Sequence, residues 1–260
     1  MSKHEKNKNK KHIVIIIQCI FWLILIYSLI QIAMWSINNK QNKKIMEEIS
    51  SSITVVEEVQ NVESQVKKEE EGYAIDFDTL KKVNGDTIAF LKVNGTQIEY
   101  PIVKTTNNEY YLNHSFDKKY NAAGWIFADY NNKFDGSDKN IVIYGHNRKN
   151  GTMFSTLKNV LHKNWYEDEK NLKIKLITEN DFFSYQVFSV YQIKKEEYYL
   201  QTNFNNDDRY LRFIEILKKR SIKDFNIDVN EEDQILTLST CANDNNYRVV
   251  LHAKKLNANQ

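Results

Sequence analysis

An uninterrupted apolar run near the N-terminus constrains this chain more than any other feature. From Ile13 to Trp35 the sequence reads IVIIIQCIFWLILIYSLIQIAMW, 23 residues without a charged side chain. About 20 such residues in a helix cross the hydrocarbon core of a bilayer, and tryptophan favours the membrane interface. The alternatives are a buried core helix and a cleaved signal peptide, whose apolar part is usually about 7–15 residues long and ends in a small-residue cleavage site. No convincing Ala-x-Ala site follows this run, so we predict a retained transmembrane signal-anchor over residues 13–35.

The charges on either side of the run predict its orientation. One acid, Glu5, precedes it together with five lysines: Lys3, Lys6, Lys8, Lys10 and Lys11. The lysines that follow it are Lys40, Lys43 and Lys44. Because the more basic flank normally stays in the cytoplasm, we expect residues 1–12 to be cytoplasmic. The protein would then be a single-pass protein of the cell membrane, with the rest of the chain extracellular.

The remainder divides by composition into a polar segment and a globular one. Residues 36–72 are rich in charge, with apolar side chains at helical spacing: Ile45, Ile49, Ile53, Val56, Val59, Val62 and Val66. We interpret this segment as a partly helical extracellular stalk. The catalytic or binding domain is then expected over residues 73–260.

Short strand-like runs dominate that domain. Asn94-Gly95 separates two of them, within 90–103, and is a strong hairpin signal. The only proline, Pro101, is expected at a strand edge or a bulge. Helical patterns cover 76–84, 152–161 and 207–220. This pattern predicts a mainly β fold, a barrel or a sandwich, with peripheral helices.

The two cysteines have different expected environments. Cys19 lies in the apolar run, which leaves Cys241 as the only thiol of the exported part. Two cysteines are too few for a disulfide scaffold or a four-cysteine zinc site. An unpaired exported cysteine indicates a reactive thiol or an intermolecular link; the alternative is a small buried apolar residue.

Arg248 is expected beside Cys241. The runs QILTLSTC (234–241) and YRVVLHAKKL (247–256) alternate as strands, and only ANDNNY separates Cys241 from Arg248. A turn of that length permits an antiparallel pair with both residues near its open end. A neighbouring cation favours the nucleophilic thiolate, and a guanidinium can donate to an oxyanion.

A proton shuttle is also needed, and histidine is the usual choice. His146 directly follows the apolar strand IVIY and a glycine, a position from which loops often present functional side chains. His114, in a polar stretch, is a lesser candidate. His252 lies about 13 Å along the strand from Arg248, so we expect it to be a packed or solvated strand residue. His162 ends a helix, where a cation interacts favourably with the helix dipole, and needs no other explanation.

Three of these segments together resemble one family. TLSTC (237–241), YRVVLHAKK (247–255) and IVIYGHNRKNGTMF (141–154) are similar to motifs of sortases, membrane-anchored cysteine transpeptidases of Gram-positive bacteria. Residues 76–116 resemble the N-terminal part of class B members. The resemblance covers about residues 74–256, with the motifs in the family's order.

The resemblance implies a sortase β-barrel and assigns roles to six residues. Cys241 matches the nucleophile, His146 the acid/base and Arg248 the oxyanion-stabilising arginine. Ser239, Thr240 and Tyr144 match positions that line the peptide groove. For Ser239 and Thr240, an ordinary structural role in the strand explains the sequence equally well. The stretch from Cys241 to Arg248 is shorter than in several class B sortases, which affects the substrate details expected at that loop.

The resemblance also implies the reaction and its partners. The enzyme would cleave a C-terminal NPQTN-like or (N/S)PxTx sorting signal of a secreted protein after threonine, through a thioester on Cys241. It would then join that protein to an amine of a cell-wall precursor or peptidoglycan stem peptide.

Two other functions stay open at this stage. One is a membrane-anchored cysteine endopeptidase that releases its acyl-enzyme to water, and the other is a catalytically silent binding or scaffold protein. No cofactor or metal is expected, because the sequence has no HExxH, GxGxxG or P-loop motif. A balance of 36 basic and 34 acidic residues gives no global field that would favour nucleic acid.

Overall fold

The computed structural model describes residues 3–56, 72–241 and 246–256. The chain divides into two compact units, Met1–Lys44 and Ile45–Gln260. The second unit therefore begins inside the segment interpreted as a stalk. Its core includes Ile45 and Ile49, which are 4% and 1% exposed.

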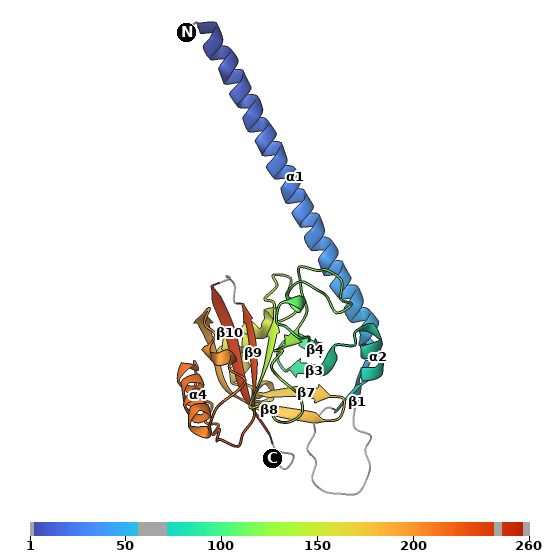
Figure 1. Cartoon of the computed structure of the whole chain (residues 1–260), viewed down its shortest axis with the longest axis vertical. Helices are drawn as coiled ribbons and strands as arrows, with labels where there is room; N and C mark the ends of the chain where they lie inside the picture. The colour runs from blue at the N-terminus through green and yellow to red at the C-terminus, as the bar shows by residue number, and fades with distance from the viewer. Residues whose placement is uncertain (1–2, 57–71, 242–245, 257–260) are drawn as a thin grey trace. The chain divides into compact units, whose positions relative to one another are not determined.

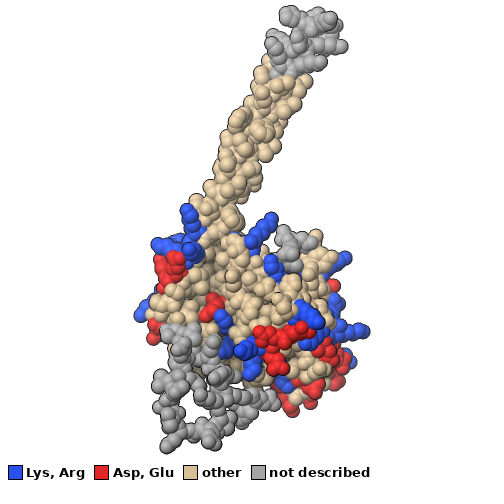
Figure 2. All heavy atoms as spheres, turned by 180° about the vertical axis from the view of Figure 1, so that it is seen from behind, with Lys and Arg blue, Asp and Glu red and all other residues tan. Residues whose placement is uncertain are grey.

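Helix α1 (Lys3–Ser50) contains the whole apolar run. By length and composition it is able to cross a membrane, and its apolar side chains over 13–35 are exposed. Figure 2 shows this stretch without a charged side chain. The helix ends before β1 (Ile53–Val56), which pairs antiparallel with β2 (Gly72–Ile75). The expected helical stripe is therefore wrong at Ile53 and Val56, where two β-branched positions take part in strand pairing; Val59, Val62 and Val66 lie outside the described residues.

Eight strands form a closed barrel in the order β10-β8-β7-β3-β4-β5-β6-β9 (Figure 1), which confirms the expected mainly β fold. Two neighbouring pairs, β4 with β5 and β6 with β9, are parallel. The strands are β3 (Thr87–Val93), β4 (Ile98–Val103), β5 (Phe127–Ala128), β6 (Asn140–Gly145), β7 (Lys173–Thr178), β8 (Phe182–Lys194), β9 (Ile235–Cys241) and β10 (Tyr247–Lys255). Closure pairs the outermost strands and so leaves no long open edge.

Local sequence explains the hairpin between β3 and β4. Val93 pairs with Ile98, and Gly95 in the turn has a φ of +67°, a conformation that glycine adopts without a steric penalty. Pro101 lies in β4, which pairs with β5 only at Val103. On its β5 side, β4 therefore lacks a continuous set of strand hydrogen bonds at Pro101. This agrees with the predicted position of the proline at a strand edge.

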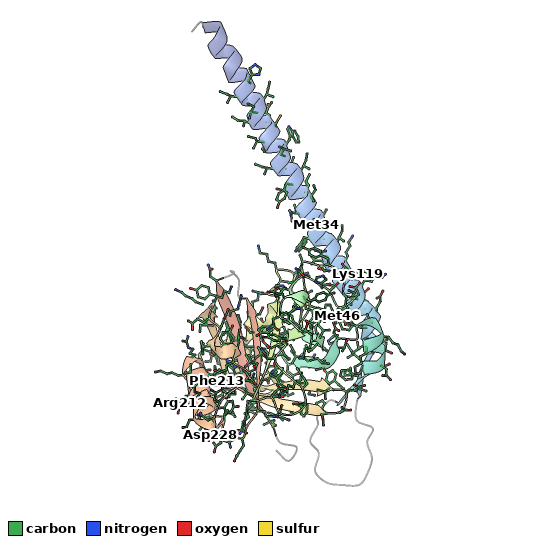
Figure 3. All side chains as sticks on the ribbon, in the orientation of Figure 1. Met34, Met46, Lys119, Arg212, Phe213 and Asp228 are labelled. Atoms are coloured by element: carbon green, nitrogen blue, oxygen red, sulfur yellow. The ribbon has the colours of Figure 1, made fainter. Side chains whose placement is uncertain are left out.

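Helices cover the outside of the barrel. Helix α2 (Phe77–Val83) begins after Asp76, whose carboxylate accepts a 2.9 Å hydrogen bond from the main-chain N–H of Thr79. Helix α4 (Asp207–Arg220) is amphipathic, with Phe213 buried and the adjacent Arg212 exposed (Figure 3).

The other helical elements are short. Residues predicted as a helix over 152–161 form a 3₁₀ helix, η2 (Ser155–Leu161). It is followed by α3 (Lys163–Tyr166) and η3 (Glu169–Leu172). Two further 3₁₀ turns, η1 (Tyr110–Leu112) and η4 (Tyr198–Leu200), lie in the connections after β4 and β8.

Candidate active site

The register of three adjacent strands brings the predicted catalytic residues to one end of the barrel. In β9 and β10, Cys241 pairs with Arg248, as an antiparallel arrangement around a short turn predicts. In the parallel pair β6 and β9, Gly145 lies opposite Thr240. His146, the next residue after Gly145, therefore follows β6 at the level where Cys241 ends β9.

For Cys241 the structure describes the backbone. Its strand position and its pairing with Arg248 are defined. The Cys241 side chain and residues 242–245, the loop expected to affect substrate details, lie outside the described residues.

His146 is held by a carbonyl from a distant segment. Its Nε2 lies 2.8 Å from the carbonyl oxygen of Leu112 in η1. A carbonyl only accepts hydrogen bonds, so Nε2 carries the proton in the neutral ring and Nδ1 is the nitrogen left to exchange a proton. The two partners are 34 positions apart in the sequence, so no local pattern predicts this contact.

The electrostatic surroundings favour the neutral imidazole. Burial lowers the pKa of His146, and the nearby positive charges of Arg148 and Arg248 lower it further, whereas the hydrogen bond to Leu112 acts in the opposite direction. A permanent cation beside the end of β9 also favours ionisation of a thiol there.

Two glycines around His146 have no room for a side chain. A Cβ on Gly145 would lie 2.6 Å from Cγ of Phe154, whose main-chain N–H donates to the carbonyl of His146 at 3.0 Å. A Cβ on Gly124 would lie 2.9 Å from Cδ2 of His146 and 2.8 Å from the carbonyl oxygen of Leu112. The histidine is therefore positioned by close backbone packing on two sides.

Tyr144 lies beside a groove at this end of the barrel. The groove has a volume of about 550 Å³, within the range of small-molecule and peptide side-chain sites. We call it the Tyr144 groove. Its lining residues are Asn108, Leu112, Phe127, Asp129, Tyr144, Glu197, Tyr198, Leu200 and Gln201.

A buried carboxylate fixes the tyrosine in that groove. The hydroxyl of Tyr144 donates to Oδ2 of Asp129 at 2.7 Å, and Nδ2 of Asn108 donates to the same oxygen at 2.8 Å. Burial, and next the negative charge of Asp129, raise the pKa of Tyr144 well above its ordinary value, so the phenol stays protonated. Sequence analysis did not find Asp129 or Asn108, because neither lies in a motif.

Ser239 and Thr240 are buried, at 4% and 3% exposure, and their hydroxyls are used internally. Ser239 Oγ lies 2.9 Å from the hydroxyl of Tyr199, and Thr240 donates to the carbonyl of Gly145. The second bond ties β9 to β6 beside the site. Neither residue lines the Tyr144 groove, so the role expected for both in peptide binding stays a prediction.

His252 and His114 are occupied elsewhere. His252 is fully buried and bonds with Tyr191 and Thr237, and burial lowers its pKa to about 3. The ring of His114 stacks on that of Tyr110 with centroids 4.0 Å apart. Within the described ranges, no three or more His, Cys, Asp or Glu side chains gather in a way that would hold a metal ion.

The chain is similar to known proteins in sequence. A family model described as the sortase domain matches residues 91–256. Sortase B of Listeria monocytogenes is 31% identical over 234 residues, covering 89% of this chain and 92% of that protein.

Solved structures show the same fold. A structure of Clostridium perfringens sortase B is 35% identical, with a TM-score of 0.66, over 70% of this chain and all of the other. A Bacillus anthracis sortase B structure, in complex with AAEK1, is 30% identical, with a TM-score of 0.70, over 85% of this chain and 98% of the other.

Proposed function

The chain belongs to the sortase family, among the class B cysteine transpeptidases, and from that premise we propose that it cleaves a C-terminal sorting signal after threonine and joins the surface protein to a cell-wall peptide amine. The observation that carries the proposal is the register that gathers Cys241, Arg248 and His146 at one barrel end. The expected signal is NPQTN-like or (N/S)PxTx.

The first half-reaction forms a thioester. Neutral His146 takes the proton of the Cys241 thiol at Nδ1. The resulting thiolate attacks the carbonyl carbon of the threonine, and Arg248 donates hydrogen bonds to the oxyanion that develops. As the tetrahedral intermediate collapses, the C–N bond breaks and His146, as imidazolium, gives its Nδ1 proton to the departing amine. Because burial and the two arginines lower the pKa of His146, the proton is held weakly and is readily transferred.

The second half-reaction transfers the acyl group. Neutral His146 takes a proton from the incoming amine, which attacks the thioester carbonyl. The new amide forms as the Cys241 thiolate leaves, and Arg248 again stabilises the oxyanion. Such covalent catalysis predicts ping-pong kinetics.

The Tyr144 groove is the proposed place for the sorting peptide. It shares Leu112 with the hydrogen bond that orients His146, so a peptide lying there would extend toward the reacting groups. A Staphylococcus aureus sortase B has been solved with a substrate, and a sortase B has been solved with triglycine. These complexes support a peptide and an amine as the two partners.

We also propose the division and topology expected from the sequence. Residues 13–35 would span the membrane, with 1–12 cytoplasmic and the stalk (36–72) and catalytic domain (73–260) outside. In intact cells a membrane-impermeant maleimide should label the wild type but not Cys241→Ala. If Cys241 is labelled only after the cells are permeabilised, the catalytic domain lies in the cytoplasm and the proposed topology is wrong.

The function is tested with the full chain in lipid nanodiscs and a library of pentapeptides that carry threonine at the fourth position. Mass spectrometry should detect a peptide thioester on the wild type and on the matched variant Cys19→Ala, and none on Cys241→Ala. Glycine or diaminopimelate peptides in excess should convert the thioester to amide.

Two outcomes would overturn the proposal. Products that stay hydrolytic in excess amine would make the protein an endopeptidase. Full surface anchoring by Cys241→Ala in cells, together with no thioester on the wild type, would make it a silent scaffold.

A further inference from the structure

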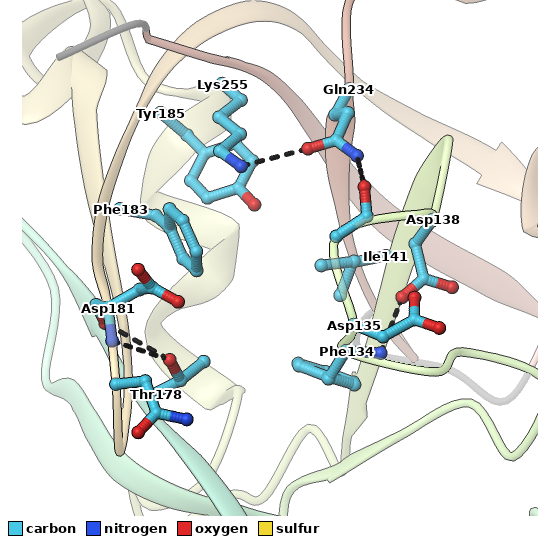
Figure 4. A pocket seen from close by; sticks show the side chains of 12 residues that line it. Phe134, Asp135, Asp138, Ile141, Thr178, Asp181, Phe183, Tyr185, Gln234 and Lys255 are labelled. Carbon is cyan, nitrogen blue, oxygen red and sulfur yellow. Dashed lines mark hydrogen bonds between the residues drawn. The ribbon is translucent and has the colours of Figure 1, made fainter.

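A second cavity opens at the barrel end opposite the active site (Figure 4). Strand β6 begins there near Ile141, and β9 begins there just after Gln234; both strands end at the active site. In β10, Lys255 at the cavity is seven residues from Arg248, or about 23 Å at ~3.3 Å per residue. The cavity holds about 440 Å³, and the mouths of β-barrels are frequent ligand sites.

A tyrosine hydroxyl faces the cavity. Tyr185 in β8 is 1% exposed and lines the cavity, and its hydroxyl points into it (Figure 4). Among the residues described, none forms a hydrogen bond with this hydroxyl. Because it opens onto the cavity, this hydroxyl is available to water or to a ligand. Burial also raises the pKa of Tyr185, so the group remains a donor as well as an acceptor.

Apolar and aromatic side chains form the walls. Phe134, Ile141 and Phe183 line the cavity around the tyrosine. The ammonium of Lys255 lies 4.1 Å from the ring centroid of Phe183 and is fixed by a 2.9 Å hydrogen bond to Oε1 of Gln234. The cavity wall therefore combines the aromatic ring of Phe183 with the fixed polar groups of Lys255 and Gln234.

The charges at the cavity have both signs. Asp138 is 9% exposed, and its carboxylate accepts from the main-chain N–H of Phe134 at 2.7 Å. Asp181 at the rim makes no side-chain hydrogen bond within the described part of the chain, and its charge acts on Lys255. A simple cation would meet the Lys255 ammonium, and a simple anion would meet the carboxylates of Asp135, Asp138 and Asp181. A neutral ligand with several hydroxyl groups satisfies donors and acceptors without either repulsion.

We propose that this cavity binds a short neutral oligosaccharide. A sugar presents C–H groups that pack on aromatic rings, and hydroxyls that both donate and accept. Tyr185 and Lys255 would donate to those hydroxyls, and Asp181 would accept from them. Because the catalytic end lies about 23 Å away, a bound sugar leaves the thiol site open.

The test uses the full chain with Cys241→Ala, in lipid nanodiscs that contain no sugar detergent. Triacetylchitotriose, cellotriose and maltotriose are the probes, and saturation-transfer NMR followed by titration is the measurement. At least one trisaccharide should bind with a Kd in the millimolar range or tighter. Absence of saturation transfer to all three would overturn the proposal.

Conservative variants locate the binding. Tyr185→Phe removes only the hydroxyl and should weaken binding about two- to tenfold, the effect of one hydrogen bond, without lowering the melting temperature. Phe183→Leu keeps an apolar wall but removes the ring and should weaken binding as well. Tyr120→Phe, at an exposed tyrosine away from the cavity, is the matched control and should bind as the parent does.

Two results would place the sugar elsewhere and refute the assignment. One is affinity unchanged in both Tyr185→Phe and Phe183→Leu. The other is displacement of the sugar by a sorting pentapeptide, which would locate it in the Tyr144 groove. Neither result depends on transpeptidation, because the protein tested lacks the thiol.

Discussion

Replacing Gly124 with alanine tests whether backbone packing positions His146. Gly124 has a φ of +59°, and an added Cβ would lie 2.5 Å from the carbonyl oxygen of Tyr111 and 2.8 Å from that of Leu112. The Leu112 carbonyl accepts the hydrogen bond from Nε2 of His146. The methyl group would therefore press directly on the support of the proposed acid/base.

The expected size of the effect has two parts. Left-handed backbone costs a residue with a Cβ roughly 1–2 kcal/mol, and overpacking adds about 1–3 kcal/mol, so stability should fall by roughly 2–5 kcal/mol. Atoms in van der Waals contact prefer about 3.5–4.0 Å, so the Leu112 carbonyl has to move by about 1 Å. A displacement of about 1 Å at a catalytic group can lower the rate about 100-fold.

Gly136→Ala is the matched control. Gly136 has a φ of +86°, but an added Cβ would meet nothing within 4 Å. It should therefore show the conformational cost without the clash, with transpeptidation unchanged. The assay is kcat/KM for peptide transfer by the full chain in nanodiscs, corrected for the folded fraction, together with the melting temperature.

The pH profile gives a second readout. The hydrogen bond to Leu112 raises the pKa of His146, so its loss in Gly124→Ala should move the acidic limb of kcat/KM to lower pH. If Gly124→Ala keeps kcat/KM within about threefold of Gly136→Ala after correction, packing at Gly124 does not position His146 and the reasoning fails.

Three further predictions concern charges around the site and in the core. Arg248→Lys should lower kcat about 100- to 1000-fold with little change in melting temperature, because an ammonium lacks the guanidinium fork; near-normal turnover would remove Arg248 from the mechanism. Arg148→Gln should raise the pKa of His146 by removing a cation that lowers it, so the acidic limb of kcat/KM should move to higher pH, while Arg148→Lys should leave it in place; an unmoved limb in Arg148→Gln contradicts this. His252 has a pKa of about 3 when folded and about 6.5 when unfolded, so the folded state binds fewer protons and its stability should fall below pH 6.5, by about 2 kcal/mol at pH 5. Urea unfolding of His252→Gln should show a correspondingly smaller loss between pH 7 and pH 5, and an equal loss would refute the assignment.

Much of the architecture was predictable from short-range sequence. The apolar run predicts helix α1 because only length and hydrophobicity decide whether a segment is able to span a bilayer. The Asn94-Gly95 turn and the alternating strands predict the hairpin and the β class, because side-chain direction alternates within each strand. The pairing of Cys241 with Arg248 was also predictable, since a short turn joins their strands.

Other features depended on contacts between distant segments. The parallel pairing of β6 with β9 joins residues 95 apart, such as Gly145 and Thr240. It places His146 at the level of Cys241, and no local pattern specifies such a parallel neighbour. The 3₁₀ form of η2 likewise differs from the expected regular helix, because packing at this helix overrides local propensity.

The sequence by itself therefore determined the apolar anchor segment, the β class and the types of residue available for chemistry. These follow from interactions within a few positions along the chain. Only the tertiary structure decided that Leu112 and Gly124 hold His146, that Asp129 fixes Tyr144, and that Tyr185 faces a cavity at the far barrel end. The physical reason is that barrel closure sets which strands are neighbours, and close packing then selects the few side chains that meet at each end.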